Sequence, residues 1–239
     1  MCMATIVLVH GAWQSARTWD YLRPMLEDKQ HEVILPILPG LGQDEAHFTE
    51  SLSLRQHIDD VCRALVAKGA YEVLLVGQDY GGIVITGVAE KMPERIGRLF
   101  YLDSLLLEDG QSAQEAGWQL AGENSRVAAG EDLWQEWGVP EGGPREFCRE
   151  RATPFARHLL EEALDLPLAA RQHLDCCYLA SVSASYPGQA LYAPAVTRAR
   201  ELGWTVDTID TGHLPQAEAP RELAEILIRR ETPSAHLIL

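Results

Sequence analysis

The chain has 239 residues, 46% of them hydrophobic and 23% charged, with a formal net charge of −15. These values exclude a disordered or fibrous protein, and the length fits one α/β domain with a small insertion. The acidic charge argues against a nucleic-acid partner, which would need a basic face, and against docking on an anionic membrane.

Apolar runs alternate with helical patterns through the first part of the chain. Continuous apolar runs are typical of strands buried on both faces, and they predict strands at 5–9, 33–35, 72–76 and 98–102. Apolar residues at helical spacing predict helices at 19–27, 54–67 and 81–91. Such an alternation requires a mostly parallel sheet with helices on both faces.

The alternation stops after the fourth strand and resumes later. Residues 105–174 carry several Trp, Gly and Pro with helical patches such as 156–164, which predicts an inserted cap or lid. The pattern is completed by a strand at 175–180, a helix at 194–202, a strand at 204–209 and a helix at 220–229. We therefore expect an α/β core formed by 1–104 and 175–239, with 105–174 as a helical cap.

The most informative motif is Val76-Gly77-Gln78-Asp79-Tyr80-Gly81-Gly82, between a strong strand and a strong helix. A G-x-nucleophile-x-G motif in this place predicts a nucleophile elbow, whose turn is too tight for side chains at the flanking positions. The central residue, usually Ser, is Asp79. The alternative is that Asp79 only caps the following helix.

Two more motifs follow strands of the same predicted sheet. His10-Gly11-Ala12-Trp13 comes after the first strand, where the N–H of Ala12 or Trp13, with that of Tyr80, would form an oxyanion hole. Gly212-His213 follows the last strand and precedes a terminal helix, where we expect a catalytic base. Purely structural roles for His10 and His213 are the alternative.

Together these motifs resemble the α/β-hydrolases, in particular the plant methylesterases, hydroxynitrile lyases and related bacterial esterases. The matching stretches are LVHGAWQSARTWDYL, ILPGLGQDE, VLLVGQDYGGIVITGVAEKMPERIGRLFYLDSLLLEDGQS and the terminal TGH. The resemblance covers roughly residues 4–112 and 200–228. It implies an α/β-hydrolase fold with a capped active site, and Ser-His-acid esterase chemistry.

The sequence departs from the family pattern at three points. Asp79 replaces the nucleophilic Ser, Gln78 replaces the usual preceding His, and no Asp or Glu lies between Leu179 and Ala199, where the acid is expected. We expect Asp103, at the end of the preceding strand, to orient His213 instead, as in some dehalogenases of the superfamily. Asp207 and Asp210 are closer to His213 along the chain, but we expect both to face solvent.

An aspartate at the elbow changes the reaction that the site favours. A carboxylate is already anionic at pH 7, whereas a Ser must lose a proton before it attacks. Attack on an ester carbonyl would give a mixed anhydride, but attack on the saturated carbon of an epoxide or carbon–halogen bond gives a stable alkyl ester, which water activated by His213 can hydrolyse. Epoxide hydrolases and haloalkane dehalogenases of the superfamily carry Asp at this position. The sequence therefore predicts a hydrolase that opens an epoxide-like or other sp3 electrophile through an Asp79 ester.

Other details do not fit a standard epoxide hydrolase or dehalogenase. The chain has HGAW in place of HGxP, has no Tyr between Tyr101 and Tyr178, and has Tyr80 where dehalogenases carry Trp. The proton donor would then be His158, Tyr80 or a cap tryptophan such as Trp118. One alternative is a lyase, cyclase or isomerase, for example in natural-product tailoring, with the elbow carboxylate or the histidine as general base. An esterase-like enzyme or a non-catalytic ligand-binding relative is another.

The sequence also suggests which cofactors and partners to expect. We expect no cofactor, because no metal or nucleotide motif is present, and a hydrophobic small molecule as substrate. Five cysteines without CxxC spacing, and a start without a basic leader, predict a cytoplasmic protein in a reducing compartment. The sequence leaves a homodimer open.

Overall fold

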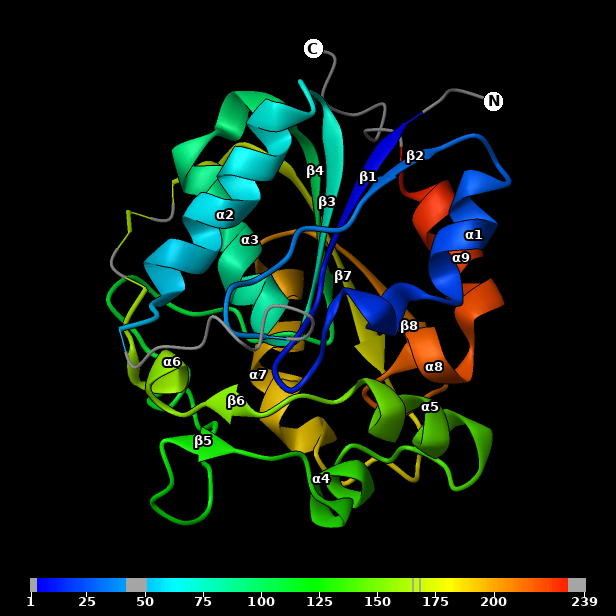
Figure 1. Ribbon diagram of the computed structural model, residues 1–239. Helices are drawn as coiled ribbons and strands as arrows, with labels where there is room; N and C mark the ends of the chain where they lie inside the picture. Colours follow the sequence, from blue (N-terminus) through cyan, green and yellow to red (C-terminus); the bar gives the residue numbers. More distant parts are fainter. Residues whose placement is uncertain (1–3, 42–50, 165, 168, 232–239) are drawn as a thin grey trace.

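A six-stranded sheet in the order β2-β1-β3-β4-β7-β8 runs through the molecule (Figure 1). The structure is a computed structural model and describes residues 4–41, 51–164, 166–167 and 169–231. Its strands are β1 (Thr5–Val9), β2 (Glu32–Ile34), β3 (Val73–Gln78), β4 (Ile96–Leu102), β7 (Asp175–Ser181) and β8 (Thr205–Ile209). Every described pairing in this sheet is parallel, which confirms the predicted sheet.

Helices cover both faces of the sheet (Figure 1). One face carries α1 (Leu22–Glu27) and α9 (Pro220–Arg229), which pack against each other. The other carries α2 (Leu54–Ala67) and α3 (Tyr80–Lys91), and α7 (Gln189–Glu201) contributes to the same core. This doubly covered parallel sheet is the predicted α/β fold.

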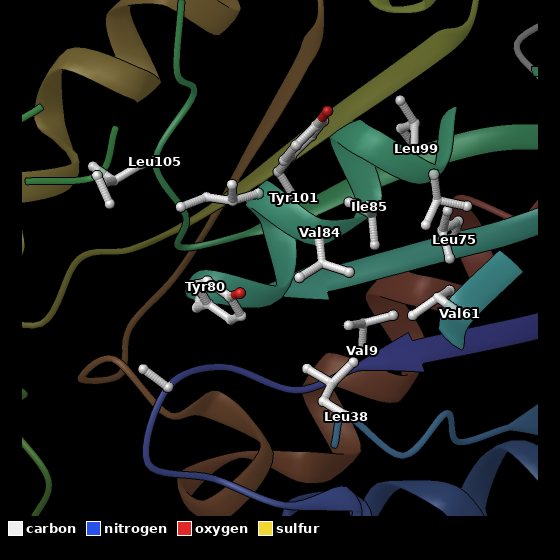
Figure 2. Close-up of a cluster of buried hydrophobic side chains, with 14 of the residues drawn as sticks. Val9, Leu38, Val61, Leu75, Tyr80, Val84, Ile85, Leu99, Tyr101 and Leu105 are labelled. Carbon is white, nitrogen blue, oxygen red and sulfur yellow. The ribbon is translucent and has the colours of Figure 1, made fainter. Parts of the chain in front are cut away.

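Alternation along each strand divides the core into two layers. Val7 and Val9 of β1 point into the layer under α2 and α3, while Ile6 and Leu8 point into the layer under α1 and α9. Figure 2 shows part of the first layer, in which Val9 belongs to one cluster with side chains of neighbouring elements such as Val84. All these side chains are fully or almost fully buried, and each contributes about 1.5–3 kcal/mol by burial.

Most of the segment between β4 and β7 lies beyond the carboxyl ends of the strands (Figure 1), and its last part returns to the opposite edge of the sheet, where the Ala170 N–H donates to Glu90 near the end of α3. It contains short elements only: β5 (Arg126–Val127), α4 (Glu131–Glu136), α5 (Gly143–Arg151), β6 (Phe155–Ala156), α6 (His158–Glu161) and the 3-10 helix η4 (Ala170–Gln172). This is the stretch that the sequence analysis interprets as a cap, and its status as a separate unit stays a prediction. Two further 3-10 helices, η1 (Ala16–Trp19) and η3 (Pro93–Arg95), and α8 (Pro215–Glu218) complete the elements.

Three predicted helices differ from the structure. The predicted helix at 19–27 is divided into η1 and α1, and the predicted patch at 156–164 is helical only over His158–Glu161. Helix α7 starts at Gln189, five positions before the predicted start, and holds Pro194 inside it. Because proline lacks an N–H and usually marks a first turn, the local sequence predicts a helix start at Pro194.

The described residues hold no helix long and apolar enough to cross a membrane. Within the same residues, no group of three or more His, Cys, Asp or Glu side chains could hold a metal ion. Cys62, Cys148, Cys176 and Cys177 are free thiols, and Cys2 lies outside the described part of the chain.

Candidate active site

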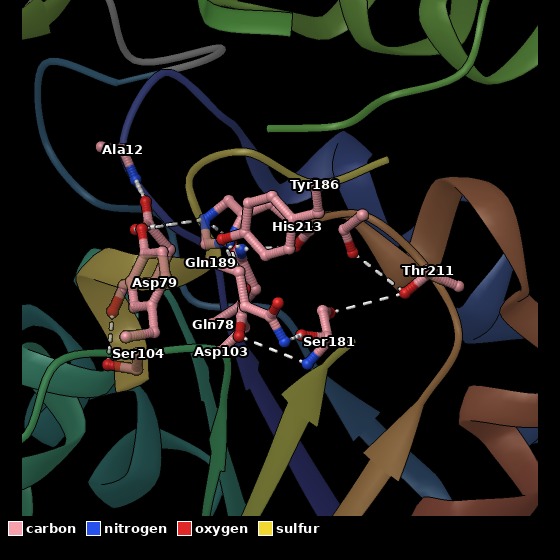
Figure 3. Close-up of polar contacts among 12 residues, drawn as sticks. Ala12, Gln78, Asp79, Asp103, Ser104, Ser181, Tyr186, Gln189, Thr211 and His213 are labelled. Atoms are coloured by element: carbon pink, nitrogen blue, oxygen red, sulfur yellow. Dashed lines mark hydrogen bonds and ion pairs between the residues drawn. The ribbon is translucent and has the colours of Figure 1, made fainter. Parts of the chain in front are cut away.

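Asp79 occupies a sharp turn between β3 and α3. Its backbone has φ 57° and ψ −122°, a conformation that costs a non-glycine residue about 1–3 kcal/mol. Neighbouring groups hold it there: Asp79 N–H donates to the Leu102 carbonyl at 3.1 Å, and Ser104 Oγ donates to the Asp79 carbonyl at 2.7 Å (Figure 3). The turn has the geometry of a nucleophile elbow.

The flanking glycines are required by close backbone contacts. A Cβ at Gly77 would lie 2.5 Å from the Gly81 carbonyl oxygen, and a Cβ at Gly81 would lie 2.5 Å from that of Val9. Within the described helix α3, the Asp79 side chain makes no cap hydrogen bond, so the simple capping alternative does not hold. The sequence confines Asp79 to this turn and leaves its carboxylate free for other partners.

Both carboxylate oxygens of Asp79 are engaged inside the protein. The Ala12 N–H donates to Oδ2 at 2.9 Å, as Figure 3 shows, which puts this oxygen in the predicted oxyanion hole. The Tyr192 hydroxyl donates to Oδ1 at 2.9 Å, and Nε2 of His213 lies 3.3 Å from the same atom. The side chains of Asp79 and His213 are both fully buried. The structure thus brings the predicted nucleophile, one predicted oxyanion donor and the predicted base together.

Asp103 contacts the far side of the His213 ring. Its Oδ2 lies 2.7 Å from His213 Nδ1 and accepts a hydrogen bond from the Tyr186 hydroxyl at 2.8 Å. Its Oδ1 accepts from the Ser181 N–H at 3.3 Å, at the strand end where the family usually carries the acid (Figure 3). Asp207, by contrast, forms a two-pronged ion pair with Arg230. The structure places Asp103 where an orienting acid is needed.

The charges in this cluster fix its protonation. Burial lowers the pKa of His213, but the negative charge of Asp79 and the hydrogen bonds to Asp103 and Asp79 raise it more, to about 9. Burial, followed by the charge of Asp79, raises the pKa of Tyr192 well above its ordinary value of 10. Both shifts favour an imidazolium at His213 and a neutral phenol at Tyr192 at neutral pH.

Two residues that the sequence analysis considers as proton donors are directed to other partners. The Tyr80 hydroxyl contacts His57 Nδ1 at 3.0 Å, and His158 Nε2 contacts the Leu52 carbonyl at 2.6 Å. Because a carbonyl only accepts, His158 donates there. His10 makes a local contact: burial lowers its pKa to about 4, and its Nδ1 contacts the Gly11 carbonyl at 3.0 Å.

The tyrosines that do reach Asp79, Asp103 and His213 lie outside the predicted cap. Tyr186 lies in the loop after β7 and Tyr192 on α7, and both hydroxyls face the histidine: Tyr186 at 3.0 Å from His213 Nδ1, Tyr192 at 3.4 Å from His213 Nε2. The Tyr192 ring also stacks on the imidazole, with centroids 4.8 Å apart. No motif in the sequence marks these two positions. The available signal was the helical spacing of a longer α7, which the proline obscured.

Aromatic rings close the site on the cap side. The centroid of the Trp13 ring lies 6.1 Å from that of Trp118, 5.7 Å from that of Trp137 and 5.4 Å from that of Phe155. The ring centroids of Trp137 and His213 are 4.6 Å apart. Asp79 itself has no exposed surface. A cavity of about 460 Å³ borders Asp103, Tyr186 and Tyr192 on the side of α7.

Comparisons with known proteins identify the family of the chain. A model described as "Alpha/beta hydrolase family" matches residues 6–226. The chain is 41% identical over 111 residues to the carbendazim hydrolyzing esterase of a Nocardioides species, a match that covers 46% of each chain. It is 29% identical over 101 residues to Methylesterase 8 of Arabidopsis thaliana, covering 42% of this chain and 37% of that one. It is 34% identical over 106 residues to a haloalkane dehalogenase of Mycolicibacterium paratuberculosis, a match that covers 42% of this chain and 34% of that one.

The matched stretch spans less than half the length of each of these curated relatives. The predicted resemblance to plant methylesterases and bacterial esterases is nevertheless confirmed by these matches. Among solved structures, an extracellular alpha/beta-hydrolase from a Paenibacillus species has a TM-score of 0.82 at 23% identity, covering 95% of this chain and 98% of that one. At that identity the likeness shows the fold.

Proposed function

The chain belongs to the alpha/beta hydrolase family, and we propose that it is a hydrolase that opens an epoxide-like sp3 electrophile through an ester on Asp79. One observation carries this proposal. The Tyr192 hydroxyl touches both Asp79 Oδ1, at 2.9 Å, and His213 Nε2, at 3.4 Å. It can therefore give its proton to an oxygen leaving group once a substrate displaces its bond to Oδ1, and recover one from His213; a dehalogenase, whose halide leaves unprotonated, does not require such a donor.

In the first step, the Asp79 carboxylate attacks a ring carbon of the epoxide and the carbon–oxygen bond breaks. The leaving oxygen takes the Tyr192 proton, and Tyr192 recovers one from the His213 imidazolium beside it. The step leaves an uncharged alkyl ester on Asp79 and a neutral His213. The loss of charge on Asp79 removes the largest influence that raises the pKa of His213, so the ring becomes a base when one is needed.

In the second step, neutral His213 removes a proton from water, and the hydroxide adds to the ester carbonyl of Asp79. The Ala12 N–H, 2.9 Å from Oδ2 in the resting state, stabilises the oxyanion that forms. Collapse releases the diol and regenerates the Asp79 carboxylate and the His213 imidazolium. Asp103 keeps the ring oriented through its 2.7 Å contact with Nδ1.

The residues around the site support a hydrophobic, aromatic substrate class. Trp13, Trp118, Trp137 and Phe155 form the aromatic wall over the catalytic groups. Aromatic walls favour aromatic and other large apolar ligands. The net charge of −15 disfavours a highly anionic substrate.

One observation favours a second candidate, a lyase, cyclase or isomerase in which Asp79 acts as general base. Both oxygens of Asp79 already hold hydrogen bonds inside a closed site. A base only has to reach a proton, whereas a nucleophile must also approach carbon in line with the breaking bond. In this case Asp79 would never form a covalent ester.

A panel of aryl epoxides, alkyl halides and aryl methyl esters tests the proposal. We expect turnover of the epoxides by the wild-type protein and loss of at least about 100-fold in Asp79→Asn. His213→Gln should still be alkylated but not hydrolyse the ester, so its intact mass should rise by the mass of one epoxide. If wild type converts none of the epoxides, or if Asp79→Asn retains full epoxide turnover, the proposal is wrong. Asp207→Asn serves as the matched control, because Asp207 pairs with Arg230 away from the site.

A further inference from the structure

Three buried glutamine side chains form a hydrogen-bonded chain that ends on His213. Nε2 of Gln216 donates to Oε1 of Gln14 at 3.2 Å, and Nε2 of Gln14 donates to Oε1 of Gln78 at 2.5 Å. Nε2 of Gln78 then lies 3.2 Å from the His213 carbonyl oxygen and 3.1 Å from His213 Nε2. The exposed fractions of Gln216, Gln14 and Gln78 are 0%, 4% and 0%, so solvent does not compete for these bonds.

One backbone carbonyl fixes the direction of the whole chain. The His213 carbonyl oxygen can only accept, so Gln78 must present its NH₂ group to it. Oε1 of Gln78 then faces Gln14, so Gln14 must present its NH₂ group to it. Oε1 of Gln14 consequently faces Gln216, which donates to it. The second N–H of Gln78 is left pointing at His213 Nε2 (Figure 3).

We propose that Gln78 is a positioning residue whose N–H, aimed at Nε2 of His213, stabilises the neutral ring with its proton on Nδ1 relative to the charged ring. An amide N–H aimed at a ring nitrogen stabilises a lone pair there and opposes a second N–H. The Nδ1 proton is accepted by Asp103 at 2.7 Å, so the two bonds select the same tautomer from opposite sides of the ring.

Other groups around the ring act in the opposite direction. Asp79 Oδ1, 3.3 Å from Nε2, favours a proton on that atom, and Asp103 favours the charged ring as well. Glu218 of α8 also acts on His213 through its charge, whereas Tyr186 and Tyr192 face the ring as neutral hydroxyls. Nε2 is thus placed between an acceptor, Asp79, and a donor, Gln78, so the charge on Asp79 decides which form prevails.

The consequence for turnover rests on the proposed function. When Asp79 becomes an uncharged ester, the Gln78 N–H remains and continues to favour a free Nε2 lone pair. That is the form of His213 that must accept a proton from water in the second step. Gln78 would therefore speed hydrolysis of the ester and leave its formation little changed.

Titration of His213 in the substrate-free protein tests the inference without relying on any activity. The protein is labelled with ¹³C/¹⁵N-histidine, and the His213 signal is assigned by its absence in His213→Gln. Gln78→Met keeps the length of the side chain but removes the donor, and we expect it to raise the pKa of His213 by about one unit, a tenfold change in the protonation equilibrium. Gln14→Met, which removes the donor that orients Gln78, should give a smaller rise.

Gln189→Met is the control, because Gln189 donates to the Ser181 carbonyl and not to the ring. It should leave the pKa of His213 unchanged. If Gln78→Met fails to fold, Gln78→Leu removes the same donor and decides the question in the same way. An unchanged or lowered pKa of His213 in the folded position-78 variant overturns the inference, whether or not the protein hydrolyses epoxides.

Discussion

Replacement of Tyr192 by phenylalanine removes one hydroxyl and tests the proposed proton donor. The ring should stay in place, because it stacks on His213 with an interplanar angle of 19° and is fully buried. The hydroxyl donates to the charged Asp79 carboxylate at 2.9 Å, and a bond of that kind contributes about 1.5–3 kcal/mol to stability. Loss of a general acid lowers a rate by about 100- to 10,000-fold, equivalent to about 3–5 kcal/mol of barrier.

A change of leaving group separates the loss of the proton donor in Tyr192→Phe from the loss of its hydrogen bond to Asp79. An aryl epoxide leaves as an alkoxide and needs a proton, whereas an alkyl bromide leaves as an ion that needs none. Single-turnover rates of Asp79 alkylation, measured by quenched-flow mass spectrometry, should therefore fall by the full factor for the epoxide and by less than about tenfold for the bromide. Equal losses with both substrates, or no loss with the epoxide, would refute the assignment of Tyr192 as the acid.

The remaining predictions concern Asp103 and His213. Asp103→Asn should lower kcat by about 100-fold or more, because Asp103 contacts His213 Nδ1. Asp207→Asn should leave kcat unchanged, because Asp207 pairs with Arg230. Steady-state kinetics of both variants would show the reverse pattern if Asp207 were the orienting acid. The pKa of His213 is raised in the folded state from 6.5 to about 9, so its stabilisation is complete below pH 6.5 and is lost as the pH rises through 9. Urea unfolding of wild type should accordingly show a lower free energy of unfolding above pH 9 than at pH 6.5, with a smaller difference in His213→Gln; the same difference in both proteins would contradict the assigned pKa.

The sequence was sufficient for the core of the fold because the signals there are local. Strands buried on both faces need continuous apolar runs, and the elbow needs glycine on both sides of Asp79, so both features are visible without any tertiary information. The position of His213 after the last strand was readable for the same reason. Asp103 followed by elimination, since the stretch after β7 offers no carboxylate, and the structure places it at 2.7 Å from the histidine.

The contacts of Tyr186, Tyr192 and Gln78 could not be predicted, because each depends on how distant segments pack. Tyr192 reaches Asp79 only because α7 begins at Gln189 and continues through Pro194, which a local interpretation treats as a helix start. The direction of the Gln78 amide depends on Gln14 and on a backbone carbonyl 135 positions away. The helical spacing of a longer α7 was obscured by Pro194, and the Gln78 arrangement leaves no periodic or compositional pattern in the sequence.

Isotope transfer from water to Asp79 tests the central claim most directly. The protein, in excess over an aryl epoxide, completes one turnover in H₂¹⁸O. The masses of the diol and of the proteolytic peptide that contains Asp79 are then measured by mass spectrometry. We expect one ¹⁸O in the Asp79 carboxylate and an unlabelled diol. The oxygen added to the product comes from Asp79, and an oxygen from water replaces it in the carboxylate. Label in the diol with none in Asp79 would contradict the account, since water would then have attacked the substrate directly.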